Sequence, residues 1–83
     1  ISKNKIELTP DMNVDSILEQ MAKRYADYEV STIDGVKIMF EKEWVHLRKS
    51  NTEPIIRIYS ESRDMESADR LAKKIMQEIM ELK

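Results

Sequence analysis

The fold class is decided by the stretch Val30–Phe40, whose sequence is VSTIDGVKIMF. Its first four residues are rich in β-branched side chains, which favour strands. Val36, Ile38 and Phe40 then occupy every second position, as in a strand with one buried face. Asp34-Gly35 lies between the two halves and is a strong hairpin signal, because both central positions of a type I′ turn need a positive φ. The stretch therefore predicts an antiparallel hairpin with its turn at Asp34-Gly35.

Two further strands are predicted downstream of this hairpin. The first is Trp44–Lys49, in which Val45 and Leu47 share one face. The second is Ile55–Ser60, and Ile56 and Ile58 form its apolar face. We expect the opposite face of this meander to be open to a partner or ligand, because its side chains are polar or aromatic: Trp44, His46, Arg48, Arg57 and Tyr59.

Helices are predicted on both sides of the strands. The first can begin at an N-cap residue, Asn13 or Asp11, and the last begins near Asp64. A short strand at Lys5–Leu8 precedes both. This order predicts an α+β fold, an antiparallel β-sheet with two main helices packed on one face. The apolar helix faces have helical spacing and comprise Val14, Ile17, Leu18, Met21, Ala22 and Tyr25 in the first helix, and Ala68, Leu71, Ala72, Ile75, Met76, Ile79 and Met80 in the last.

The composition is that of a single small globular domain spanning residues 1–83. Its 14 Lys and Arg against 16 Asp and Glu give a net charge of -2, which argues against a nucleic-acid partner. The absence of cysteine excludes disulfides, thiolate–zinc sites and a cysteine nucleophile. No apolar run approaches the ~20 residues that cross a bilayer, so we expect no membrane partner and a cytoplasmic location. Because the chain starts at Ile1, we expect a piece of a longer protein.

The loop Arg48–Pro54 and the Arg57 that follows it are the main candidates for chemistry. The loop combines a guanidinium group, the hydroxyls of Ser50 and Thr52, the Asn51 amide and several backbone N–H groups. Such donors suit a tetrahedral phosphate dianion, which accepts hydrogen bonds from several directions. If the two arginines pair across adjacent strands, their guanidinium groups can converge on one anion. The same residues also fit an ordinary turn, since Ser, Asn and Thr side chains bond to their own backbone.

No other constellation points to catalysis. His46 is the only histidine; we expect no Ser/His/Asp set and interpret His46 as a residue of the sheet face. Carboxylate pairs such as Glu41/Glu43 and Glu78/Glu81 are expected to be solvated charges, and no metal-ligand spacing is present. Three methionines of the last helix are expected to fill the core, namely Met65, Met76 and Met80.

The stretch Arg48–Glu61, RKSNTEPIIRIYSE, resembles the phosphate-binding loop of the α-D-phosphohexomutases. This family includes phosphoglucomutase/phosphomannomutase and phosphoglucosamine mutase, and an R-x-S-[GN]-T-x-P motif with a later Arg lies in its C-terminal, fourth domain. The resemblance extends upstream through Thr32–Val36 and Glu43–Val45, and downstream into the last helix. It implies a TATA-box-binding-protein-like α+β domain within a longer enzyme.

By this resemblance, Arg48, Ser50, Asn51, Thr52 and Arg57 would bind the substrate phosphate that is not reacting. The intact enzyme would be an intramolecular phosphotransferase that interconverts hexose 1-phosphate and 6-phosphate through a bisphosphate. A phosphoserine and Mg²⁺ would belong to other domains, so this fragment would contain no catalytic residue, bind no cofactor or metal, and be inactive alone. The implied partners are the hexose phosphate and the other domains of the same chain.

Two positions depart from the pattern of many relatives. Lys49 stands where they have Pro, which implies a less rigid loop with an added charge. Asn51 replaces Gly but tolerates a positive φ better than most residues. Two alternatives stay open. One is a non-catalytic α+β module for RNA or protein, in which Trp44 and Tyr59 would stack on bases. The other is a small assembly domain that uses the Met-rich helix.

Overall fold

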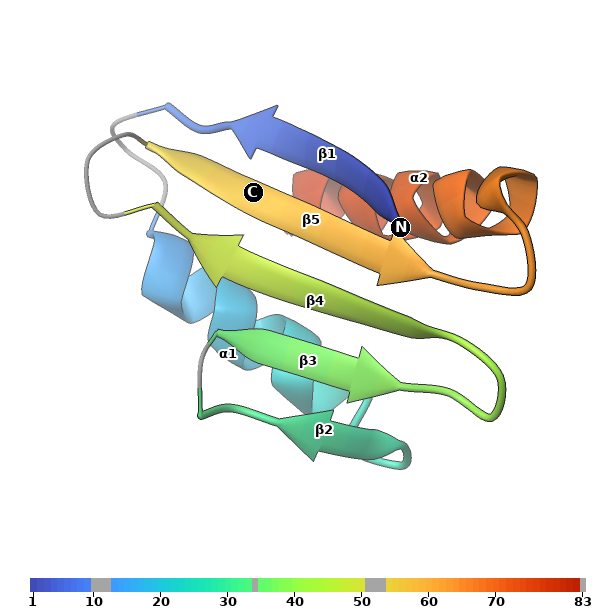
Figure 1. Cartoon of the computed structure of the whole chain (residues 1–83). Coiled ribbons are helices and arrows are strands. Elements are labelled where there is room, and N and C mark those ends of the chain that lie inside the picture. The colour runs from blue at the N-terminus through green and yellow to red at the C-terminus, as the bar shows by residue number, and fades with distance from the viewer. Residues whose placement is uncertain (10–12, 34, 51–53, 83) are drawn as a thin grey trace.

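The computed structural model describes residues 1–9, 13–33, 35–50 and 54–82. The strands form one antiparallel sheet in the order β1-β5-β4-β3-β2. Both helices lie behind this sheet in Figure 1, which confirms the α+β fold with helices on one face. In chain order the elements are β1 (Ser2–Glu7), α1 (Val14–Arg24), β2 (Glu29–Ser31), β3 (Val36–Met39), β4 (Trp44–Lys49), β5 (Ile55–Glu61) and α2 (Met65–Glu81).

The hydrophobic core lies between the helices and the sheet. It is built from the alternate strand positions and the helix faces that the spacing predicts. Met80 is an exception in the predicted face of α2, because its side chain is 42% exposed. The central core side chains, all fully buried, are Met21, Ile38, Val45, Leu47, Ile56, Ile58, Ile75 and Ile79.

The two helices are joined to each other at their C-terminal halves. α1 begins at the predicted cap, where Asn13 Oδ1 accepts from Ser16 N at 3.0 Å. At its other end, the hydroxyl of buried Tyr25 donates to Glu78 Oε2 of α2 at 2.5 Å. Arg24 Nη1 lies 3.1 Å from Glu78 Oε1. One carboxylate therefore fixes the end of α1 against α2.

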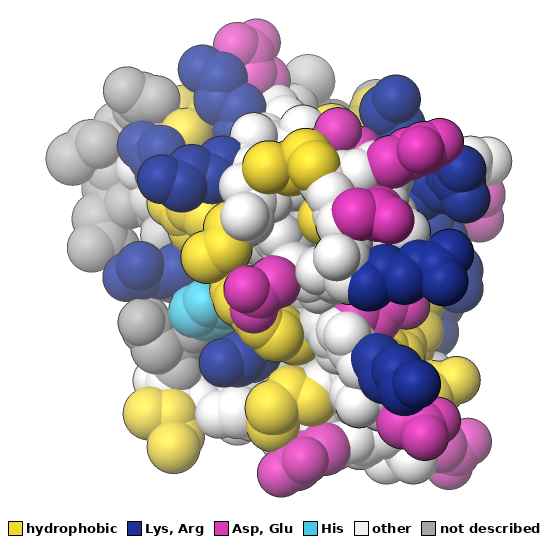
Figure 2. All heavy atoms as spheres, turned by 45° about the vertical axis from the view of Figure 1, so that its right-hand side comes forward, with side chains coloured by type: hydrophobic (Ala, Val, Ile, Leu, Met, Phe, Trp, Pro, Cys, Tyr) yellow, Lys and Arg dark blue, Asp and Glu magenta, His cyan; other side chains and the backbone are white. Residues whose placement is uncertain are grey.

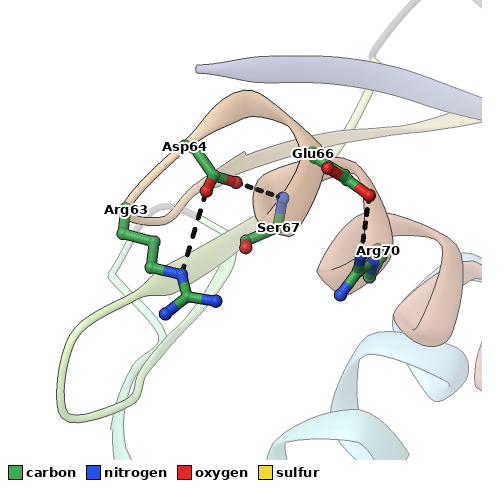
Figure 3. Close-up of polar contacts among 5 residues, drawn as sticks. All are labelled: Arg63, Asp64, Glu66, Ser67 and Arg70. Atoms are coloured by element: carbon green, nitrogen blue, oxygen red, sulfur yellow. Dashed lines mark hydrogen bonds and ion pairs between the residues drawn. The ribbon is translucent and has the colours of Figure 1, made fainter.

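α2 also begins at its predicted cap. Asp64 Oδ1 accepts from Ser67 N at 2.7 Å, as Figure 3 shows. This backbone hydrogen bond lowers the pKa of the Asp64 carboxyl, so the charged cap persists well into the acid range. Arg63 stands beside the same carboxylate, and Glu66 pairs with Arg70 one turn further on. The charged side chains around the first turn of α2 therefore pair with one another.

The hairpin formed by β2 and β3 differs from its prediction in register. Ser31 lies opposite Lys37, which leaves five residues between them. A two-residue turn at Asp34-Gly35 would require an even number, so the observed register does not fit the predicted two-residue connection. Asp34 itself lies outside the described residues. Gly35 is the fourth of these five residues and supplies a positive φ of 77° within the connection.

β1 is longer than the predicted strand and starts at Ser2. It pairs along its whole length with β5, far away in sequence, and it brings Lys5 opposite Arg57. The Ser2 hydroxyl donates to Asp69 of α2, which ties the start of the strand to the helix layer. Leu8 follows the strand and donates from its N–H to Pro54 O at 2.7 Å. The end of β1 therefore lies against the chain that enters β5.

Candidate functional site

Arg48 and Arg57 are direct neighbours on the open face of the sheet. They are cross-strand partners in β4 and β5, so their side chains leave the sheet on the same side. Cβ atoms of such partners lie about 4.5–5.5 Å apart. Both side chains are exposed, whereas Leu47 and Ile58, which point to the other face, are fully buried. The structure thus brings together the two arginines that the sequence singles out.

Ser50 stands where β4 and β5 separate. Its N–H donates to Ile55 O at 3.2 Å, which closes the base of the loop two residues beyond the arginine pair. The Ser50 side chain is half-buried. The other two predicted site residues, Asn51 and Thr52, lie outside the described residues. The described part of the site is therefore two arginines and a serine at the mouth of one loop.

The arginine pair places two like charges side by side, which destabilises an antiparallel sheet. Within the described ranges, Arg57 forms no ion pair with a carboxylate. An anion held between the guanidinium groups would replace this repulsion with charge-assisted hydrogen bonds, each contributing about 1.5–3 kcal/mol. The local electrostatics therefore favour an anionic ligand.

Lys49 does not add its charge to this face. It is the cross-strand partner of buried Ile56 and so points to the helix side of the sheet. There its Nζ lies 2.9 Å from Asp15 Oδ1, in the first turn of α1. The expectation that Lys49 adds charge to the loop is therefore not met, because its ammonium group is neutralised by α1.

A shallow cavity of about 510 Å³ lies between α1 and the β2–β3 hairpin. Leu18 and Ala22 of α1 form its floor together with Val36, and Ile33 at its rim is 96% exposed. Arg48 is also among the lining residues. Gly35 also lines it and lies close to β4, so the hairpin can approach the backbone of the arginine strand.

His46 is a sheet-face residue, as expected, and its cross-strand partners are Lys37 and Tyr59. Beside it, Trp44 Nε1 donates to Glu61 Oε2 at 2.7 Å, and Lys37 Nζ stands 4.8 Å from the centre of the Trp44 ring. One face of the indole is therefore already covered. This arrangement weighs against the alternative in which Trp44 stacks on RNA bases.

The expectation that three methionines of the last helix fill the core is only partly met. Met76 packs against the core, but Met65 and Met80 are exposed, so the prediction that they fill the core is wrong. Among the described residues, no cluster of three or more His, Asp or Glu side chains could hold a metal ion. Neither helix of this described part has the length and apolar character of a membrane span.

The sequence patterns do not identify Lys5, a charged residue near the arginines, as part of the site. Lys5 is the cross-strand partner of Arg57 on β1, and its side chain is exposed on the same face as the arginines. Strand alternation around Ile6 and Leu8 places Lys5 on the face away from the core, but nothing in the sequence names β5 as the partner of β1. The position of Lys5 therefore comes only from the sheet order.

Comparison with known proteins supplies the family. The family model described as "Phosphoglucomutase/phosphomannomutase, C-terminal domain" matches residues 5–78. Phosphoglucosamine/phosphogalactosamine mutase of Sulfurisphaera tokodaii is 40% identical over 75 residues, which cover 88% of this chain and 16% of the relative. Phosphoglucomutase/phosphomannomutase of Thermococcus kodakarensis is 54% identical over 41 residues, or 49% of this chain and 9% of the relative. A probable phosphoglucosamine mutase of Pyrococcus horikoshii is 35% identical over 72 residues, which cover 87% of this chain and 14% of the relative.

The chain spans about a sixth or less of the length of these relatives. The matching region contains the arginine pair, the loop base and most of both helices. Because the family model covers nearly the whole chain, the protein belongs to the phosphoglucomutase/phosphomannomutase family, through that family's C-terminal domain.

Proposed function

We propose that this domain holds the non-reacting phosphate of a hexose phosphate, in an enzyme that interconverts the 1-phosphate and the 6-phosphate through a bisphosphate. The cross-strand pair of Arg48 and Arg57 is the observation that carries the proposal, because it directs two guanidinium groups to one side of the sheet. Ser50 adds a hydroxyl at the loop base. We assign Asn51 and Thr52 to the same site from the sequence motif alone.

The family membership supports the enzyme class. Relatives that match most of this chain are named phosphoglucosamine mutases, and another relative is named phosphoglucomutase/phosphomannomutase. We therefore expect the intact protein to be an intramolecular phosphotransferase. Its phosphoserine and Mg²⁺ are assigned to other domains, and its location is expected to be the cytoplasm. The present chain is then a binding part without mutase activity of its own.

Binding the non-reacting phosphate contributes to the reaction by positioning the substrate. Interaction energy gained at the non-reacting end of the substrate holds the reacting end against the groups that transfer the phosphoryl group. A bisphosphate intermediate must then turn over and present its other phosphate. Arginine forks and hydroxyls recognise phosphate oxygens and not the sugar, so one site serves both orientations.

A titration of the 83-residue chain tests this proposal. Inorganic phosphate and glucose 1-phosphate should each bind with a Kd of roughly 1 mM, because a few charge-assisted bonds on an exposed face give weak affinity. Amide shifts in a nitrogen–proton correlation spectrum should centre on residues 48–52 and on Arg57. Unphosphorylated glucose is the matched control and should cause no shifts there. Phosphate shifts centred elsewhere, or equal effects of glucose, would contradict the proposal.

A further inference from the structure

We propose that Lys5 is a third cation of the phosphate site, so that the anion is held by β1 as well as by β4 and β5. The inference rests on the proposed function of Arg48 and Arg57 and extends it to a strand outside the loop motif. It assigns Lys5 as a residue that binds the substrate phosphate.

The sheet register aligns the three cations in one row. Lys5 is opposite Arg57 in the β1–β5 pairing, and Arg57 is opposite Arg48 in the β4–β5 pairing. Directly opposed residues of adjacent strands point to the same face, with Cβ atoms about 4.5–5.5 Å apart. Arg57 therefore stands between two other cations. Figure 2 shows several Lys and Arg side chains gathered on the same face as the single histidine.

The row lies at the loop end of the sheet. β1 runs toward the end at which β5 starts, as Figure 1 shows. Just beyond β1, Leu8 N donates to Pro54 O at 2.7 Å. An anion bound at the loop base beside Arg57 would therefore be flanked by β1. The flexible stem of Lys5 allows its ammonium group to reach an oxygen that the two arginine forks leave exposed.

Two cations of the row, Lys5 and Arg57, have no ion pair with a described carboxylate, although Glu7 lies on the same face of β1, two residues beyond Lys5. The chain as a whole nevertheless has a net charge of -2. Three adjacent cations cost stability in the absence of an anion, since like charges opposite one another in a sheet repel. A phosphate dianion carries the charge and the number of acceptor oxygens that such a row can bind.

Other nearby lysines are engaged elsewhere, which singles out Lys5. Lys49 is ion-paired with Asp15 on the helix side of the sheet. Lys37 lies over the ring of Trp44. Lys3 is on the same strand and face as Lys5 but stands opposite Tyr59, two residues further from the loop. Lys3 therefore provides a matched control with the same charge and the same strand environment.

The test is a phosphate titration of four variants of the 83-residue chain in 0.15 M NaCl, followed by amide shifts. Lys5→Gln should weaken the affinity for inorganic phosphate about 3–10-fold, whereas Lys3→Gln should change it less than 2-fold, because added salt screens charges beyond about 8 Å. Lys5→Arg should retain most of the affinity. Arg57→Ala should remove binding at the site. Unchanged core resonances in each variant show that the fold is intact, which is expected because the substituted side chains are exposed.

The outcomes separate the two proposals. If Arg57→Ala abolishes phosphate binding but Lys5→Gln weakens it no more than Lys3→Gln, the role of Lys5 is refuted and the arginine site stands. If Arg57→Ala leaves the affinity unchanged, the proposed function fails and the role of Lys5 fails with it. A selective loss in Lys5→Gln together with rescue by Lys5→Arg supports the three-cation site.

Discussion

Gly35 lies so close to β4 that a Cβ added to it would stand 2.2 Å from the carbonyl oxygen of Leu47. Leu47 immediately precedes Arg48, so the glycine contacts the backbone that aims the first arginine of the site. The positive φ of 77° at Gly35 adds a second constraint, because side-chain-bearing residues rarely adopt it. The hairpin connection and β4 are therefore in close contact at Gly35 and the Leu47 carbonyl.

Gly35→Ala should therefore destabilise the domain by about 1–3 kcal/mol, the usual cost of holding a side-chain-bearing residue in a strained backbone conformation. The added methyl group must also displace β4, so phosphate affinity should fall even where the domain remains folded. Urea unfolding and the phosphate titration measure the two effects. Thr32→Ala, an exposed change in the same connection, should be near-neutral in both assays. A fully stable, fully binding Gly35→Ala variant would contradict the close approach.

Arg48→Ala in the intact enzyme should lower kcat/KM by about 2–3 kcal/mol, or roughly 30–150-fold, and should raise KM. The physical reason is that the variant loses one of the two guanidinium groups that donate hydrogen bonds to the phosphate. Steady-state kinetics with the hexose phosphate measure it. The control is Arg63→Ala, since Arg63 is paired with Asp64 beside the start of α2 and should be dispensable. Near-normal kinetics in the Arg48 variant would defeat the assignment.

Phosphate should raise the thermal stability of the isolated chain, because it binds the native state and relieves the repulsion between Arg48 and Arg57. For a Kd near 1 mM, about 10 mM phosphate adds about 1.4 kcal/mol by mass action. Differential scanning calorimetry against chloride at equal ionic strength isolates the specific effect. In Arg57→Ala the phosphate-dependent increase in Tm should vanish. An equal increase in that variant would indicate a general salt effect and not a site.

The stability of the domain should decline as the pH rises above about 10, the ordinary pKa of tyrosine in an unfolded chain. Burial, reinforced by the hydrogen bond to Glu78, raises the pKa of Tyr25 above that value in the folded state. Above pH 10 the unfolded chain therefore releases a proton that the folded chain retains, and unfolding becomes more favourable. Below pH 10 the contribution of Tyr25 is fully present.

Urea unfolding at pH 8 and at pH 10.5 measures this dependence. Tyr25→Phe should be less stable than the parent at pH 8, because it loses the bond to Glu78, but should lose less stability between the two pH values. Tyr59→Phe is the control and should leave the alkaline slope unchanged, because Tyr59 lies on the open face of the sheet, away from Tyr25 and Glu78. Equal slopes in the parent and Tyr25→Phe would rule out the tyrosine as the cause.

The local parts of this fold could be predicted from the sequence. Helical spacing gave the buried faces of both helices, and short polar residues gave the caps at Asn13 and Asp64. Alternation gave β4 with its observed bounds and the opposite faces of β4 and β5. These features depend on neighbours within about one helical turn or two strand positions, which is the range over which sequence patterns act.

The remaining parts depend on contacts between distant segments. The pairing of β1 with β5 joins the first strand to one far along the chain, and no turn or spacing signal encodes it. The register of the hairpin differs by one residue from that of the expected turn, because the connection has an odd number of residues, with the positive φ at Gly35. For the site, the motif indicated the two arginines, whereas Lys5 could be found only from the sheet order.

The sheet order has a consequence for how the molecule behaves in concentrated solution. β1 and β2 are the two outermost strands, and their free backbone groups are where a second sheet could attach and start a fibre. β2 is only three residues long, and β1 presents Lys3 and Lys5 along its exposed face. Short length and positive charge are common protections against such growth. Lys5, which we propose binds phosphate, thus also opposes edge-to-edge association between copies of the domain.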